Sequence, residues 1–120
     1  WNRRILVMDK DLVLKQTINV NAWCSKDGTD AATCKASEAV TDRPYLALLA
    51  DGRLLATDPE HGKILVFGAD GAPAGTYDVP LNTGATFARP VGIATDGTSV
   101  IVADSSGNVV RKIPLAEIAP

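Results

Sequence analysis

Several functional classes lack their usual signals in this sequence. The 120 residues carry 12 basic and 14 acidic side chains, a formal net charge of −2, and only 5% are aromatic. Nucleic-acid-binding domains gain most of their affinity from basic contacts to phosphate, and those that bind single strands also use aromatic stacking. The longest apolar run, Tyr45 to Ala50, has the length of a buried strand and falls far short of the ~20 residues that cross a bilayer. We expect no nucleic-acid binding, and membrane attachment only through upstream segments.

The chain is also poor in residues that build metal or catalytic sites. His61 is the only histidine and falls in a predicted turn, so we expect it to be exposed. Asp27, Asp30 and Glu38 do not follow the spacing of a calcium-binding loop, and no Gly-x-Ser-x-Gly or phosphate-binding motif is present. We predict no catalytic residue, no metal site and no cofactor in this chain.

What the sequence does contain is an internal repeat. Three pairs of matching residues stand 46 positions apart: Pro44 and Pro90, Asp58 and Asp104, and Phe67 and Ile113. A third, partial copy opens the chain, where Asn2–Asp9 matches His61–Gly68 at an offset of 59. The larger offset places an insertion of 13 residues around the segment from Cys24 to Cys34. Because a recurring aspartate serves each repeat, Asp58 and Asp104 are expected to make a structural hydrogen bond, not to catalyse.

Each copy consists of short apolar segments separated by turn sequences, which predicts strands. The strands expected in the middle copy are Tyr45–Ala50, Leu54–Thr57, Lys63–Phe67 and Gly75–Val79. The inner segments are almost wholly apolar and the last is mixed, as in a sheet whose inner strands are covered on both faces. Asp51, Asp70 and Asp96 each precede glycine and indicate turns. No helical period separates the strands, and the one candidate helix, Ala31–Val40, falls in the insertion.

The last copy resembles the NHL repeat. Arg89–Asp104 contains Arg-Pro-x-Gly-Ile-Ala-x-Asp-Gly followed by Val-Ala-Asp, and Trp1–Ile5 is similar to the Asn-x-Arg-Ile signature of that family. The middle copy departs from the pattern at Leu46 and Thr57. The resemblance implies an all-β fold, a β-propeller made of four-stranded antiparallel blades. The family includes RNA-binding, protein-binding, lyase and scaffold proteins, so the resemblance does not fix a function.

The resemblance also implies a division of the chain. The expected segments are residues 1–20 (last two strands of a first blade), 21–42 (inserted loop), 43–80 (a complete blade) and 81–120 (first three strands of a final blade). The chain ends after Pro114–Pro120, where a blade of the family has its fourth strand. The resemblance implies that the N-terminal end of the ring supplies this strand, and we expect the natural C-terminus near Pro120. Propellers need about four blades to close. The ring in this chain is therefore incomplete, and an upstream part of the polypeptide or other copies are expected to complete it.

Cys24 and Cys34 are the only cysteines, and both lie in the insertion. Their spacing is not Cys-x-x-Cys, so a structural disulfide is the preferred interpretation over a redox pair, a zinc site or free thiols. A disulfide that closes a loop of this size stabilises by roughly 3 kcal/mol and is typical of oxidising compartments. It predicts an extracytoplasmic location: the cell surface, the periplasm or the medium.

These observations favour a non-catalytic binding or scaffolding module, the C-terminal part of a larger propeller protein that presents loops to a protein or glycan partner. The alternative is part of a propeller lactonase or lyase with a metal in the central channel. Basic pairs do not support an RNA surface, because strand alternation sends Arg3 and Arg4 to opposite faces, and likewise Arg111 and Lys112.

Overall fold

The structure is a computed structural model that describes residues 3–23, 43–81 and 88–120. The chain divides into two compact units, residues 1–40 and 41–120. Regular structure in the described residues is almost entirely antiparallel β-sheet, which confirms the prediction of an all-β fold. Predictions on the Cys24–Cys34 insertion, including the Ala31–Val40 helix and the three acidic residues there, lie outside the described residues.

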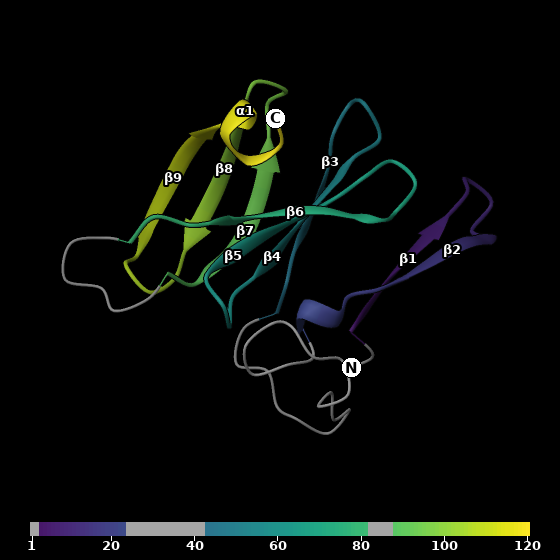
Figure 1. The fold of residues 1–120 in the computed structure, drawn as a ribbon, viewed down its shortest axis with the longest axis horizontal. Coiled ribbons are helices and arrows are strands. Elements are labelled where there is room, and N and C mark those ends of the chain that lie inside the picture. Colours follow the sequence, from purple (N-terminus) through teal and green to yellow (C-terminus); the bar gives the residue numbers. More distant parts are fainter. Residues whose placement is uncertain (1–2, 24–42, 82–87) are drawn as a thin grey trace. The chain divides into compact units, whose positions relative to one another are not determined.

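The first unit contains a β-hairpin of β1 (Arg4–Met8) and β2 (Leu14–Asn19), followed by a short 3₁₀ turn, η1 (Asn21–Trp23) (Figure 1). The tight connection between the strands is stabilised by Asp9, whose Oδ1 accepts backbone N–H bonds from Asp11 at 2.9 Å and Val13 at 3.0 Å. A short polar side chain that satisfies backbone donors two and four residues ahead is typical of such turns.

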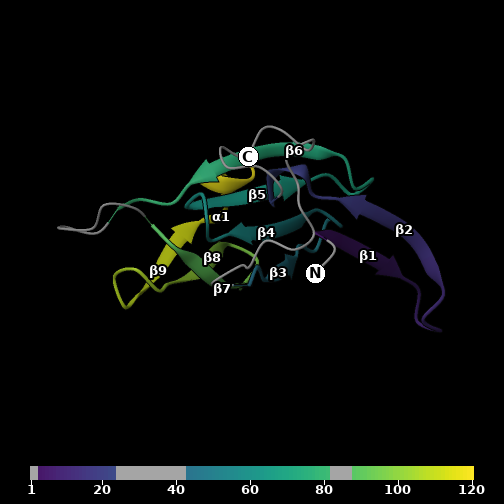
Figure 2. The same ribbon diagram turned by 90° about the horizontal axis from the view of Figure 1, so that it is seen from below.

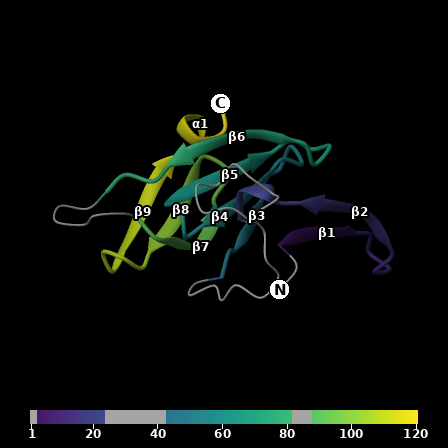
Figure 3. The same cartoon turned by 60° about the horizontal axis from the view of Figure 1, so that its bottom comes forward.

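The second unit contains two antiparallel sheets. The first has the order β3 (Leu46–Leu48), β4 (Leu54–Asp58), β5 (Lys63–Phe67), β6 (Pro73–Asp78), and Figure 2 shows these four strands one above another. The second has the order β7 (Pro90–Thr95), β8 (Ser99–Asp104), β9 (Val109–Pro114). A short helix, α1 (Leu115–Ile118), follows β9 next to the C-terminus (Figure 3).

The 46-residue repeat reappears as an identical strand register. Leu55 pairs with Val66 in the β4–β5 hairpin, and Ile101 pairs with Lys112 at the corresponding place in β8–β9. The same offset holds for the other pairs of the two hairpins, so both copies fold alike.

The 59-residue offset is reproduced as well. Every pair of the β1–β2 hairpin has its counterpart in β5–β6, and both hairpins carry a bulge at the same place, between Val7 and Met8 and between Val66 and Phe67. One further signature joins all three copies. The residue before β1, β5 and β9 has a positive φ: 46° at Arg3, 66° at Gly62 and 51° at Asn108.

The first strands of the two larger copies differ, which the constant period did not predict. Leu46 pairs with Ala56 in β3–β4, whereas in β7–β8 the residue opposite Val102 is Ile93, one position later than the period requires. A bulge between Pro90 and Ile93 adds one residue to β7. The loop that follows has one residue fewer than the loop between β3 and β4, so the overall spacing returns to 46.

The core of the second unit lies between its two sheets. Leu55, Ile64 and Val66 of the first sheet pack with Val100, Val102 and Ile113 of the second, all at most 6% exposed. The outer strand β6 is largely exposed, as its mixed composition predicted. Burying apolar surface stabilises the contact between the two sheets by roughly 25 cal/mol for each Å² removed from water.

The sheet of the last copy contains three strands, β7 to β9, and the segment that follows Pro114 does not form a fourth. The segment forms α1, which places Ile118 and Ala119 in the core at 4% and 5% exposure. A strand continuing along the edge of β9 would leave these side chains outside the core. Arg53 holds the segment in place, since its Nη1 donates to the carbonyl oxygen of Ala119 at 2.9 Å.

Candidate functional site

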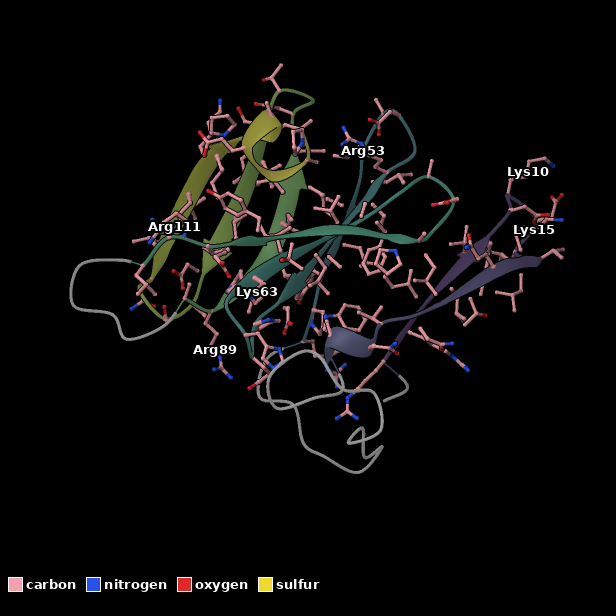
Figure 4. The ribbon with its side chains drawn as sticks, in the orientation of Figure 1. Lys10, Lys15, Arg53, Lys63, Arg89 and Arg111 are labelled. Atoms are coloured by element: carbon pink, nitrogen blue, oxygen red, sulfur yellow. The ribbon has the colours of Figure 1, made fainter. Side chains whose placement is uncertain are left out.

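Charged and polar side chains gather at one end of the second unit, where β4 turns into β5, β8 turns into β9, and the chain enters β7. This group is called the polar rim here, and its members are Asp58, Glu60, His61, Arg89, Asp104, Ser106 and Arg111. Arg89 lies at this end and Arg53 lies at the opposite end (Figure 4). The rim therefore combines the two repeat-equivalent turns that follow Asp58 and Asp104.

Asp58 and His61 form a shielded pair. His61 Nδ1 lies 2.7 Å from Asp58 Oδ2, and only 13% and 2% of the two side chains are exposed. Burial raises the pKa of the Asp58 carboxyl above its usual value, although the interaction with His61 opposes that change. The prediction that His61 is an exposed turn residue is wrong in part. It lies in the turn, but its ring folds back onto the buried carboxylate, which no local sequence pattern indicates.

Asp104 occupies the equivalent position with different partners. Its Oδ1 accepts the backbone N–H groups of Arg89 and Ser106, each at 3.0 Å, and the Ser106 hydroxyl at 2.7 Å. Its Oδ2 lies 3.7 Å from Arg111 Nε. Burial acts to raise the Asp104 pKa, but these hydrogen bonds and the charge of Arg111 outweigh it and hold the pKa below its usual value.

Arg89 connects the two turns. Its Nη2 donates to Glu60 Oε1 at 3.0 Å, in the turn after β4. Its carbonyl oxygen accepts the backbone N–H of Ser105 at 3.0 Å, in the turn after β8. Sequence reasoning recognised the Arg-Pro dipeptide as part of a repeat but did not find this bridge, because the second copy has Ser106, not an acidic residue, at the position of Glu60.

Thr57 makes a second link between the sheets that the sequence did not reveal. Its buried hydroxyl accepts the backbone N–H of Tyr45 at 2.9 Å and donates to the carbonyl oxygen of Val91 at 2.9 Å. This threonine stands where the NHL pattern has alanine. The departure from the pattern was the available signal, since a polar side chain in a buried strand requires a hydrogen-bonding partner.

The geometry of the rim supports a structural role for its two aspartates. Both are buried to 1% exposure, and each binds a different group in the turn that follows it: Asp58 the His61 ring and Asp104 the backbone N–H of Ser106. The Ser106 hydroxyl donates to Asp104 and His61 Nδ1 lies against Asp58, so each aspartate holds a side chain of the turn that follows it. Within the described ranges, no group of three His, Cys, Asp or Glu side chains is arranged to hold a metal ion.

The other predicted turn residues behave as expected. Asp51, Asp70 and Asp96 each accept a backbone N–H two residues ahead, from Arg53, Ala72 and Thr98. Arg111 and Lys112 take opposite faces of β9, with 19% and 68% of their side chains exposed. Cys24 and Cys34 lie outside the described residues.

Comparisons with known proteins leave the family open. No model of a known protein family matches the chain, and no curated protein sequence matches it. Among the described residues, no helix is both long enough and apolar enough to cross a membrane.

Proposed function

We propose that this chain is a non-catalytic binding or scaffolding module built from propeller blades of the NHL type. The observation that carries the proposal is the repetition of strand register between β4–β5 and β8–β9 and between β1–β2 and β5–β6. Repeat folds of this kind provide a rigid frame on which loops vary. We expect the ring to be incomplete in this chain and to be completed by further sheets of the same repeat.

The rim supports display over catalysis. Its two equivalent turns keep the same register but carry different side chains, with Glu60 and His61 in one copy and Ser106 and Gly107 in the other. The buried aspartates fix the backbone of each turn and leave the intervening positions free to vary. Residues on a rigid frame that differ between copies are suited to contact a partner.

The location and the partner of the module follow from its insertion. A disulfide between Cys24 and Cys34 is typical of an oxidising compartment and would place the module outside the cytoplasm. The loop and the rim would then be the surfaces offered to a protein or glycan partner. The near-balanced charge does not favour nucleic acid as that partner.

Two measurements test this function. Metal analysis of the purified protein should find no stoichiometric Ca²⁺ or Zn²⁺; a stoichiometric ion would support the alternative of a lactonase or lyase. A glycan array and cross-linking to cell-surface proteins should then identify ligands. Deleting residues 25–33 or changing Arg89→Gln should weaken binding, whereas Lys10→Gln, at an exposed position in the first unit, should not. If binding is unchanged by both the deletion and Arg89→Gln, neither the loop nor the rim is the contact surface.

A further inference from the structure

The two faces of each sheet in the second unit are not equivalent. In the β3–β6 sheet, one face carries Leu55, Thr57, Ile64 and Val66, which are buried to 4% exposure or less. We call it the front face. The apolar members of this face pack against Val100, Val102 and Ile113 of the next sheet, which belong to the face we call the back. The two sheets of the second unit therefore pack front against back, and we call this arrangement the packing rule.

The equivalent front face of the β7–β9 sheet is exposed. The residues equivalent to the buried four are Ile101, Ala103, Val110 and Lys112. Ile101 and Ala103 are half-buried, Val110 is 71% exposed and the Lys112 side chain is 68% exposed. Val110 of the edge strand β9 stands at a position that is fully buried as Ile64 in the preceding copy, which indicates a face built to be covered.

The packing rule specifies what covers this face: the back face of another sheet of the same repeat. The chain carries one such face exposed, on the β1–β2 hairpin. Leu6 and Met8 correspond in register to the back-face residues Leu65 and Phe67 of β5, which are 3% exposed, yet they are themselves 42% and 45% exposed. Leu14, which pairs with Met8, is 53% exposed.

We propose that copies of this chain associate head to tail, with the front face of β7–β9 in one copy covering the back face of β1–β2 in the next. The proposal rests on the repeat architecture of the proposed function and names the partner of its open face. Pairing of two front faces is disfavoured, since it would bring two Lys112 ammonium groups together in an apolar contact. When two copies associate head to tail, one front face and one back face of the pair remain open for further copies. Contacts of this kind build rings or filaments.

Sedimentation velocity over a range of concentrations tests the assembly. The wild-type chain should form species larger than 12.6 kDa. Val110→Asp places a charge on the front face and Met8→Asp places one on the back face. Each should raise the dissociation constant roughly tenfold or more, because a carboxylate is costly to bury. Val13→Asp changes a 52% exposed residue in the β1–β2 turn, outside both faces, and should leave association unchanged.

Mixing the two variants gives the decisive result. Val110→Asp keeps an intact back face and Met8→Asp keeps an intact front face, so an equimolar mixture should form a complex of two chains and nothing larger. Circular dichroism of each variant confirms that it is folded. A monomeric wild-type chain, variants that associate like the wild type, or a mixture that stays monomeric would each overturn the proposal. The metal and ligand-binding measurements are independent of these outcomes, so a monomer that still bound a ligand would leave the proposed function in place.

Discussion

His61 Nδ1 approaches Asp58 Oδ2 to 2.7 Å in a pair that solvent hardly reaches, and the repeat-equivalent Asp104 has no histidine near it in the corresponding turn. The two aspartates therefore hold the same place in the repeat but ionise differently. The pKa of Asp58 is raised above its ordinary value of 3.8, mainly by burial, and that of Asp104 is lowered below it. This difference gives the two residues opposite effects on stability as pH changes.

Asp58→Asn should make the protein more stable relative to wild type as pH rises. The folded-state pKa of Asp58 lies above its unfolded value of about 3.8. The contribution of Asp58 to the free energy of unfolding is therefore fully present below pH 3.8 and is lost as pH rises through the folded-state pKa. Asparagine keeps a polar group against His61 and has no charge to desolvate. The free energy of unfolding, measured by denaturant titration between pH 3 and pH 7, should show the variant gaining on wild type across that range.

Asp104→Asn should behave in the opposite way. Its lowered pKa means that the stabilising contribution is present above pH 3.8 and is lost as pH falls through the folded pKa. The variant weakens the charge-assisted bonds from Ser106 and Arg89, so we expect a loss of about 1–3 kcal/mol at pH 7 that shrinks toward pH 3. The same titrations measure it. If both variants changed in the same direction with pH, the contrast between the two turns would be wrong.

Thr57→Val should destabilise the second unit by about 1–3 kcal/mol, because the Tyr45 amide and the Val91 carbonyl each lose a hydrogen bond at 2.9 Å. The change conserves shape and removes only the hydroxyl. Urea unfolding measures the loss, and Thr57→Ser, which keeps the hydroxyl, is the matched control and should cost less. Equal losses in the two variants would show that packing of the methyl group, not the bridge, matters at this position.

Gly62→Ala should cost more stability than Gly97→Ala. Both glycines have a positive φ, 66° and 92°, so alanine strains the backbone by about 1–2 kcal/mol at either position. A Cβ at Gly62 would also lie 2.9 Å from the carbonyl oxygen of Ala88, whereas a Cβ at Gly97 meets nothing within 4 Å. Thermal unfolding of the two variants compares them directly. A Gly97→Ala variant as unstable as Gly62→Ala would contradict the predicted contact.

Alkylation of the native protein tests the disulfide between Cys24 and Cys34. Two alkyl groups should be added only after reduction, as measured by intact mass. Reduction should also lower the free energy of unfolding by roughly 3 kcal/mol, since it releases the constraint on the unfolded chain. Labelling of both cysteines without reduction would remove the disulfide and the argument for an extracytoplasmic location.

The sequence predicted the features that depend on local patterns. Apolar runs and Asp-Gly dipeptides placed β4 and β5 within one residue of their observed bounds, and the repeat offsets of 46 and 59 reappear in the strand pairs of four hairpins. The features that it missed depend on contacts distant in sequence. The bridge from Arg89 to Glu60 joins residues 29 apart, and α1 forms after β9 with Ile118 and Ala119 buried in the core. No local propensity encodes either contact.

The bulge in β7 has a consequence for engineering. A consensus blade could be designed by aligning the two copies at a constant spacing of 46, which would align Leu46 with Gly92. The strand pairs instead match Leu46 with Ile93, because Leu46 pairs with Ala56 and Ile93 pairs with the equivalent residue, Val102. Because neighbouring residues of a strand point to opposite sides, an alignment at 46 would mix inward and outward positions throughout the first strand. A tandem array designed from this protein should therefore be aligned on its strand pairs, with an offset of 47 in β3 and β7 and of 46 in the two strands that follow.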